Sequence, residues 1–372
     1  MLPPFRLERY FARYEFNTPF LLCSSDCESW TVEELLRLEP EASERLQSLW
    51  LGYTESAGNP ALRRAIAEIY QRITPDDVLV CAGAEEVIFL WMHAALSPGD
   101  HVIVHSPCYQ SLAELPLSLG CTVSPWQARA HNQWQLDFSE LQAALRPNTR
   151  ALVLNTPHNP TGFLMSQADF TRVCEWTDER GILLLSDEVY RELEYNPADR
   201  LPAACDVSGN AVSIGVLSKT YGLPGLRIGW AATRNRVLRE RMAQVKDYTT
   251  ICSSAPSELL AEIALRHRQT LASRNLQIIA TNLALLDTFF ARHRDWFDWQ
   301  KPGAGPIAFP KLRQGDINAF CQELAQAAGV LLLPGTLYDD TGNHFRLGFG
   351  RRNLPEALAR LGRFLIEKND SR

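Results

Sequence analysis

The feature that most constrains the fold is an alternation of short apolar runs with longer helical patterns between Tyr53 and Thr233. Apolar runs of strand length occupy residues 78–81, 101–105, 121–125, 151–155, 182–185 and 212–217. The segments between them carry the helical patterns 61–72, 84–96, 138–145 and 167–180. Strands that alternate with helices are typical of a mainly parallel sheet covered on both faces. The sequence therefore predicts an α/β fold for this part of the chain.

The regions on either side of the alternation have a different character. After Thr233 the pattern is helical as far as Arg292, and from Trp296 short strands mix with two helices. A chain of 372 residues is too long for one small core, so two lobes are expected. We predict an N-terminal arm (1–48) that joins the small domain, a large domain (49–270), and a linker helix with a small α+β domain (271–372).

Composition excludes several classes of function. The formal net charge is −6 and no segment is strongly basic, which argues against nucleic acid as a partner. No apolar run reaches the roughly 18–20 residues that span a bilayer, and the N-terminus lacks the apolar core of a signal peptide. The nine cysteines form no Cys-x-x-Cys pair and accompany no histidine cluster, which predicts reduced thiols and no metal site. We expect a cytoplasmic protein that does not bind membranes.

The last apolar run of the alternation leads into a lysine. Ser218 and Lys219 follow the run, a turn with two glycines comes next, and Arg227 lies eight residues after the lysine. A desolvated lysine amine loses its proton readily and attacks carbonyl compounds. The planar guanidinium of Arg227 suits a phosphate. Together these residues favour a ligand that carries both an aldehyde and a phosphate.

Other residues with suitable chemistry follow the neighbouring strands, at the edge where open α/β sheets bind ligands. Gly83 and Ala84 begin a helix whose free amides suit a phosphate, although a plain turn explains them equally well. Tyr109 has a ring that can stack on a cofactor or pack in a core. Asp187 follows a buried strand, where it can cap a helix or pair with a protonated pyridine nitrogen.

In this order the motifs resemble those of the class I/II, fold-type I pyridoxal-phosphate aminotransferases, over nearly the whole chain. Asn159–Gly162 is similar to the family's N-P-T-G, and Asp187–Tyr190 to its D-x-x-Y. Ser218–Gly229 matches S-K-x-x-G-x-x-G-x-R-x-G. The resemblance implies a fold-type I transferase, with a large domain built on a mainly parallel sheet and a smaller α+β domain.

The resemblance also implies a role for each residue. Lys219 is expected to bind pyridoxal 5'-phosphate as an aldimine and to move a proton at the substrate Cα. Asp187 is expected to pair with the pyridinium, and Asn159 and Tyr190 are expected to bond to the phenolic oxygen. Tyr109 is expected to stack on the ring. The phosphate is expected to lie among Gly83, Ala84, Ser218 and Arg227. We count Lys219, Asp187 and Tyr109 as catalytic. Arg346, with Asn159, is expected to hold the substrate α-carboxylate, and Tyr53 to reach the phosphate of a neighbouring subunit in a homodimer with shared sites.

Two segments depart from the family pattern. Cys23–Trp30 stands where the family has a glycine-rich substrate loop, and the loop 246–254 resembles a subgroup near capreomycidine synthase. We therefore predict transamination between an amino acid and a 2-oxo acid, with elimination, replacement or cyclisation of an amino acid as the alternative. A third possibility is the effector-sensing part of a transcription regulator, but the residues before Tyr53 leave no room for a helix-turn-helix segment.

Overall fold

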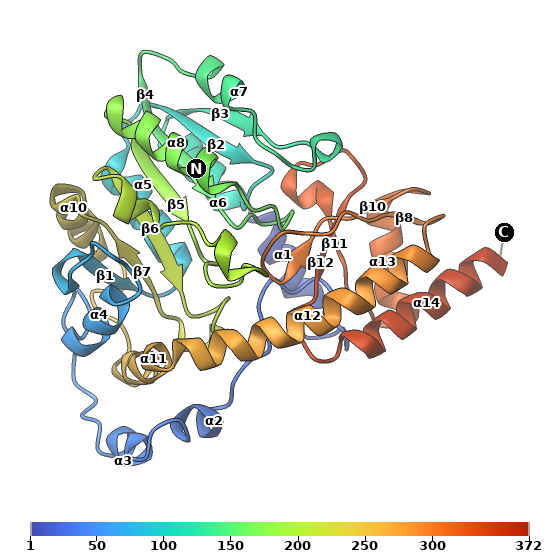
Figure 1. Ribbon diagram of the computed structural model, residues 1–372, viewed down its shortest axis with the longest axis horizontal. Helices are drawn as coiled ribbons and strands as arrows, with labels where there is room; N and C mark the ends of the chain where they lie inside the picture. Colours follow the sequence, from blue (N-terminus) through green and yellow to red (C-terminus); the bar gives the residue numbers. More distant parts are fainter. Residues whose placement is uncertain (1, 371–372) are drawn as a thin grey trace.

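The computed structural model describes residues 2–370, and a twisted sheet forms its centre (Figure 1). Within these residues the sheet has seven strands in the order β1-β7-β6-β5-β4-β2-β3. Their bounds are β1 Val78–Cys81, β2 His101–Ser106, β3 Thr122–Gln127, β4 Thr149–Asn155, β5 Leu183–Asp187, β6 Ala211–Val216 and β7 Gly229–Ala232. Strands β3, β2, β4, β5 and β6 pair in parallel, while β7 runs antiparallel to β6 and β1. The predicted α/β fold with a mainly parallel sheet is confirmed.

Helices cover both faces of this sheet, which explains why most residues of the central strands are apolar and buried. Alternate residues of β4 enter different cores: Val153 joins the core that includes α5, whereas Leu152 and Leu154 join the core that includes α8. This arrangement follows from the two-residue repeat of side chains along a strand. The helices of this part are α4 Pro60–Ala67, α5 Ala84–Ala95, α6 Gln110–Ser118, α7 Phe138–Ala143, α8 Gln167–Glu179, α9 Ala204–Val207 and α10 Arg236–Lys246.

Two consecutive helices follow: α11 (Ala255–Arg266), which packs in the same core as residues of β1 and β7, and α12 (Arg268–Arg292). The sequence pattern is helical as far as Arg292, but the structure separates the two helices at His267, whose φ of −106° and ψ of 20° are not helical. The longer helix, α12, runs from the sheet to the C-terminal elements (Figure 1). Its length lets it connect the two parts of the molecule.

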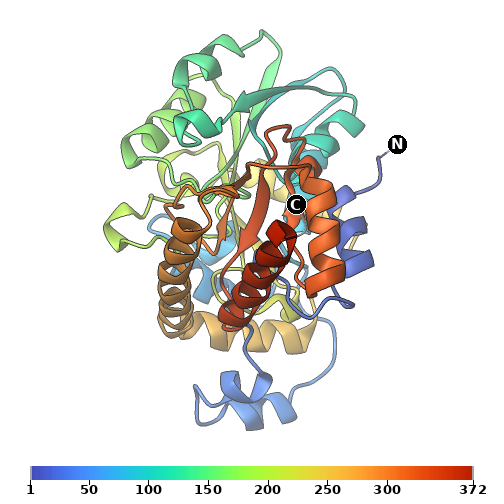
Figure 2. The same cartoon turned by 90° about the vertical axis from the view of Figure 1, so that its right-hand side faces the viewer.

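The C-terminal part combines small sheets with helices. Within the described chain these sheets have the orders β11-β12-β9 and β10-β8. The bounds are β8 Phe297–Asp298, β9 Ile307–Ala308, β10 Lys311–Leu312, β11 Leu333–Pro334, β12 Phe345–Gly348, α13 Ile317–Ala328 and α14 Leu354–Asp370. Figure 2 faces this part and shows α12, α13 and α14, drawn from brown-orange to red, in front of the central sheet.

The N-terminal arm contacts both parts of the molecule. Its helices are α1 (Arg6–Tyr14), α2 (Val32–Leu36) and α3 (Ala42–Gln47), and α2 begins at a capping box formed by Thr31 and Glu34. Helices α2 and α3 pack with α11, and the segment that follows α1 meets the C-terminal part. The amide of Phe20 donates to the carbonyl of Gly329. The division into 1–48, 49–270 and 271–372 stays a prediction.

Short 3-10 turns complete the described chain: η1 Pro75–Asp77, η2 Ala130–Asn132, η3 Pro197–Asp199, η4 Pro224–Leu226 and η5 Gly335–Tyr338. Among residues 2–370, no helix has the length and apolar character that crossing a bilayer requires.

Candidate active site

A cavity of about 420 Å³ lies at the carboxyl ends of the parallel strands and collects most of the predicted site residues. Nine of them line it: Ala84, Tyr109, Asn159, Asp187, Tyr190, Ser218, Lys219, Arg227 and Arg346. Most of them come together because the carboxyl ends of parallel strands share one edge of the sheet, whereas Arg346 comes from β12 of the small sheet β11-β12-β9. Of the remaining two predicted residues, Gly83 precedes Ala84 at the rim, and Tyr53 lies outside the cavity with 89% of its surface exposed.

The amine of Lys219 lies inside this cavity, just beyond β6. Its Nζ donates a hydrogen bond to Ser25 Oγ at 2.8 Å. Burial lowers the pKa of Lys219, with the Asp26 carboxylate acting in the opposite direction and Arg346 adding to the decrease. A lysine with a lowered pKa is more often the neutral amine that reacts with an aldehyde.

Asp187 ends β5 and presents its carboxylate to the same cavity. Oδ1 accepts a hydrogen bond from the amide of Val189 at 3.2 Å, and the carboxylate has no other hydrogen bond within residues 2–370. Burial raises its pKa to about 6, and the Lys219 amine partly offsets this effect. A buried carboxylate with a free oxygen is suited to a cationic partner such as a protonated pyridine nitrogen.

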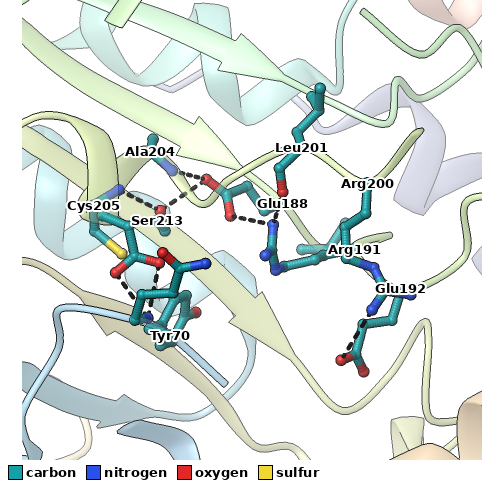
Figure 3. Close-up of polar contacts among 12 residues, drawn as sticks. Tyr70, Glu188, Arg191, Glu192, Arg200, Leu201, Ala204, Cys205 and Ser213 are labelled. Atoms are coloured by element: carbon teal, nitrogen blue, oxygen red, sulfur yellow. Dashed lines mark hydrogen bonds and ion pairs between the residues drawn. The ribbon is translucent and has the colours of Figure 1, made fainter. Parts of the chain in front are cut away.

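Glu188, the residue after Asp187, joins the end of β5 to neighbouring residues through a network of polar contacts (Figure 3). Glu188 is buried, and its Oε1 accepts hydrogen bonds from the amide of Ala204 and from Ser213 Oγ, both at 2.8 Å. Arg191 lies 4.0 Å from the second carboxylate oxygen. Because Ser213 belongs to β6, this network ties the end of β5 to the strand that leads to the lysine. The direction of Asp187 is thereby set.

The start of α5 forms a cradle suited to a phosphate. Gly83 has a φ of 89°, and a Cβ there would lie 2.7 Å from Arg227 Nη2. A Cβ on Gly229 would lie 2.6 Å from the backbone of Gly83. Only glycine permits this approach of backbone and guanidinium. Helix-start amides, the Ser218 hydroxyl and a guanidinium provide the donors and positive charge that a phosphate needs.

Arg346 lies on β12 at the opposite side of the cavity and is 2% exposed. Its Nε donates to the carbonyl of Cys23 at 3.0 Å, and its Nη1 donates to Tyr338 Oη at 2.5 Å and to Asn159 Oδ1 at 3.3 Å. Tyr338 Oη in turn donates to Asn159 Oδ1 at 3.2 Å. The acceptor end of the Asn159 amide is therefore occupied, which leaves its Nδ2 donor for a ligand.

The tyrosines differ in how closely they match their predicted roles. Tyr190 Oη donates to the carbonyl of Ser25 at 3.1 Å, and Tyr109 Oη donates to Glu8 Oε1 at 3.3 Å. Both rings border the cavity. Tyr53 does not join them in this chain, so its predicted contact requires a second subunit.

Sequence reasoning missed several residues that the cavity contains. They come from α1 and from the segment Cys23–Trp30, and the structure also adds Tyr338 to the site. Asp26 forms an ion pair with Arg351 at 2.9 Å, and the carboxylates of Glu8 and Glu15 also line the cavity. The unusual composition of Cys23–Trp30 was the one signal in the sequence that pointed to this region.

Comparisons with known proteins show the family of this chain. The family model described as aminotransferase class I and II matches residues 18–361. The chain is 30% identical to capreomycidine synthase of Streptomyces vinaceus over 366 residues, which cover 96% of this chain and 92% of that protein. It is 31% identical to a valine–pyruvate aminotransferase of Mycobacterium tuberculosis over 328 residues, covering 85% of this chain and 84% of that one.

A solved structure gives the same result. The crystal structure of a PLP-dependent aminotransferase from Streptococcus suis superposes with a TM-score of 0.93 at 33% identity and covers 98% of both chains. These matches confirm the fold-type I architecture, the enzyme class and the pyridoxal phosphate cofactor that the motifs implied. The chain belongs to the class I and II aminotransferase family.

Proposed function

We propose that the chain moves an amino group between an amino acid and a 2-oxo acid, with Lys219 as the attachment point for pyridoxal 5'-phosphate and as the proton carrier. The observation that carries the proposal is the single cavity that contains the Lys219 amine, the Asp187 carboxylate and the Arg346 guanidinium. When bound, pyridoxal phosphate supplies an electron-withdrawing ring that acidifies the substrate Cα–H bond.

The side chains have separate tasks in this proposal. Arg346 binds the α-carboxylate of the amino acid through Nη2, because its Nε donates to the carbonyl of Cys23 and its Nη1 donates to Tyr338 and Asn159. This anchor directs the Cα–H bond toward Lys219. The neutral amine of Lys219 removes the proton from Cα and delivers it to the former aldehyde carbon of the cofactor. Asp187 keeps the pyridine nitrogen protonated, and pairing with that cation offsets the cost of its own burial.

The charges around the cavity also restrict the substrate side chain. Arg351 is paired with Asp26, so it is not a free partner for a second substrate carboxylate. Glu8 and Glu15 border the cavity from α1 and its C-terminal end. Like charges in such a site repel one another. We therefore propose that the amino donor has a neutral or cationic side chain.

Absorbance spectroscopy tests the proposal. The purified protein with pyridoxal phosphate is expected to show a visible band that Lys219→Ala abolishes and that Lys301→Ala retains. Lys301 is a matched control because it lies at the surface in an ion pair with Asp287. Single amino acids added to the wild type should remove the band, with neutral or basic amino acids acting faster than aspartate. A protein that stays colourless with added cofactor would refute the proposal.

The similarity to capreomycidine synthase supports a second candidate function, in which the same residues catalyse elimination or cyclisation of an amino acid. The two candidates differ in stoichiometry. Transamination consumes one amino acid per site until a 2-oxo acid is added. Continuous release of ammonia or of a cyclised product without any acceptor would establish the second candidate instead.

We also propose a homodimer in which Tyr53 of one subunit reaches the phosphate of the other. Large apolar side chains are exposed at Trp50 and Tyr53, and again at Tyr248 and Ile251. Residues next to these two segments are bonded to each other: Thr54 Oγ1 donates to the carbonyl of Ser253 at 3.2 Å. Exposed apolar surface of this kind favours association.

Subunit mixing tests the shared site. Lys219→Ala and Tyr53→Ala subunits, each impaired alone, should regain activity when they form mixed dimers. A monomer in sedimentation experiments would contradict the proposal.

For the compartment we propose the cytoplasm, supported by nine cysteines that are all free.

A further inference from the structure

The segment Cys23–Trp30 is held in place by backbone hydrogen bonds to both parts of the molecule. The amide of Gly348 donates to the carbonyl of Leu22 at 3.0 Å, and the amide of Glu28 donates to the carbonyl of Gly350 at 2.8 Å. The amide of Trp30 donates to the carbonyl of Gly222 at 3.2 Å. The segment therefore bridges β12 and the loop that follows Lys219.

Three glycines make this contact close enough to exclude any side chain. A Cβ on Gly348 would lie 1.8 Å from the carbonyl oxygen of Ser24, and one on Gly350 would lie 2.5 Å from that of Asp26. A Cβ on Gly222 would lie 2.4 Å from the carbonyl oxygen of Glu28. Packing of backbone against backbone leaves the segment little freedom to shift.

Ser25 lies in the middle of this fixed segment and meets two residues of the site. Its Oγ accepts the hydrogen bond from Lys219 Nζ at 2.8 Å, and its carbonyl oxygen accepts the one from Tyr190 Oη at 3.1 Å. Within residues 2–370, the hydroxyl and carbonyl oxygens of Ser25 make these two hydrogen bonds. The hydroxyl thus has a defined location, set by a rigid backbone, beside the reacting amine.

We propose that Ser25 positions the amine of Lys219 for proton transfer, an inference that rests on the proposed function above. When the substrate amine takes the place of Lys219 on the cofactor, the lysine becomes a free amine on a flexible stem. A flexible lysine has considerable rotamer entropy, which lowers the fraction of time that it spends in a reactive geometry. A hydrogen bond to a fixed hydroxyl restricts the amine to the region beside Cα.

The proton balance of the step leaves Ser25 unchanged. The neutral amine uses one N–H for Ser25 Oγ and directs its lone pair at the Cα proton. The resulting ammonium keeps its bond to Ser25 and gives one proton to the neighbouring carbon of the cofactor, which restores the amine. Ser25 accepts a hydrogen bond throughout and neither gains nor loses a proton.

The test compares Ser25→Ala with Ser25→Thr, which keeps a hydroxyl, and with Ser29→Ala, an exposed serine of the same segment. Rapid mixing with an amino acid that the wild type accepts gives the rate constant for loss of the visible band and the dissociation constant of the amino acid. For Ser25→Ala we expect about a tenfold lower rate constant, as for the loss of one hydrogen bond to a charged group, with cofactor content and dissociation constant within about twofold. Ser25→Thr should recover most of the rate, and Ser29→Ala should match the wild type.

The pH profile separates positioning from a purely structural role. An acceptor stabilises the ammonium more than the neutral amine, so its removal lowers the pKa of Lys219. The rate constant for loss of the visible band is expected to rise with pH as the Lys219 amine loses its proton. This rising part of the profile, the acidic limb, should therefore move to lower pH in Ser25→Ala.

A Ser25→Ala variant with an unchanged rate and an unchanged acidic limb would overturn the inference while leaving the proposed function intact. If Ser25→Ala does not fold, a Ser25→Thr variant that folds and is as slow as Lys219→Ala would also overturn it. A wild type that shows no visible band or no response to any amino acid would instead refute the proposed function.

Discussion

Replacing Asp187 with asparagine should stabilise the cofactor-free protein while weakening its hold on the cofactor. Burial raises the pKa of Asp187 in the folded protein to about 6, compared with its ordinary value of 3.8. At about 1.36 kcal/mol per pH unit, this difference corresponds to a destabilisation of about 3 kcal/mol when the carboxyl is ionised in both the folded and unfolded states. Asparagine has a similar shape, can accept the same amide hydrogen bond and carries no charge.

The pH dependence follows from the sign of the shift. Below about pH 4 the carboxyl is protonated whether or not the chain is folded, so its burial has no electrostatic cost. Between about pH 4 and 6 the unfolded chain releases the proton first, and stability falls as the pH rises. Above about pH 6 the full cost is present. The advantage of Asp187→Asn should therefore be about 3 kcal/mol at pH 8 and about half of that at pH 5.

Urea unfolding of the cofactor-free proteins at these two pH values measures the advantage. Asp199→Asn, which changes an exposed carboxylate, serves as the control and should alter stability by less than about 0.5 kcal/mol. With pyridoxal phosphate bound, the wild type should instead be more stable than Asp187→Asn, because the wild-type carboxylate then pairs with a cation. An advantage that is the same at pH 5 and pH 8, or a variant less stable than the wild type at pH 8, would refute the reasoning.

Three further predictions concern the substrate side of the cavity. Arg346→Lys should raise the KM for the amino acid about 10- to 100-fold in steady-state kinetics and keep the visible band, because a lysine ammonium cannot keep the bonds to Cys23, Tyr338 and Asn159 and also bind a carboxylate. Tyr338→Phe removes the hydroxyl that joins Asn159 and Arg346, so kcat/KM should fall about tenfold with little change in cofactor content. Gly348→Ala should lower the free energy of unfolding by about 1–3 kcal/mol, since the added methyl would lie 1.8 Å from a backbone oxygen. Gly209→Ala meets no atom within 4 Å and should be nearly neutral by the same denaturation assay.

The residues at the carboxyl ends of the parallel strands, where we propose that the cofactor binds, were predictable from local patterns. Asp187 and Lys219 each follow an apolar run, and the parallel arrangement of those runs requires their carboxyl ends to meet. The motifs around Asn159 and Arg227 then gave the family, which the comparisons confirm. The roles of the individual residues stay predictions until variants are measured.

The substrate side was not predictable in the same way. Ser25 is 194 residues from Lys219 along the chain, and Arg346 is 323 residues from the carbonyl of Cys23 to which it donates. Tyr338 lies in a short 3-10 turn that carries no motif. No local pattern specifies such contacts, because they depend on how the N-terminal arm docks between β12 and the lysine loop.

The sequence by itself determined the class of fold and the cofactor, and it predicted the lysine that we propose binds the cofactor. These follow from periodicity and from short motifs, which act over a few residues. The tertiary structure alone decided three contacts in the cavity: the pairing of Asp26 with Arg351, the bridge of Tyr338 between Asn159 and Arg346, and the contact of Ser25 with Lys219. Glycines that allow backbone to touch backbone bring these distant segments together, and that close packing is a property of the folded chain as a whole.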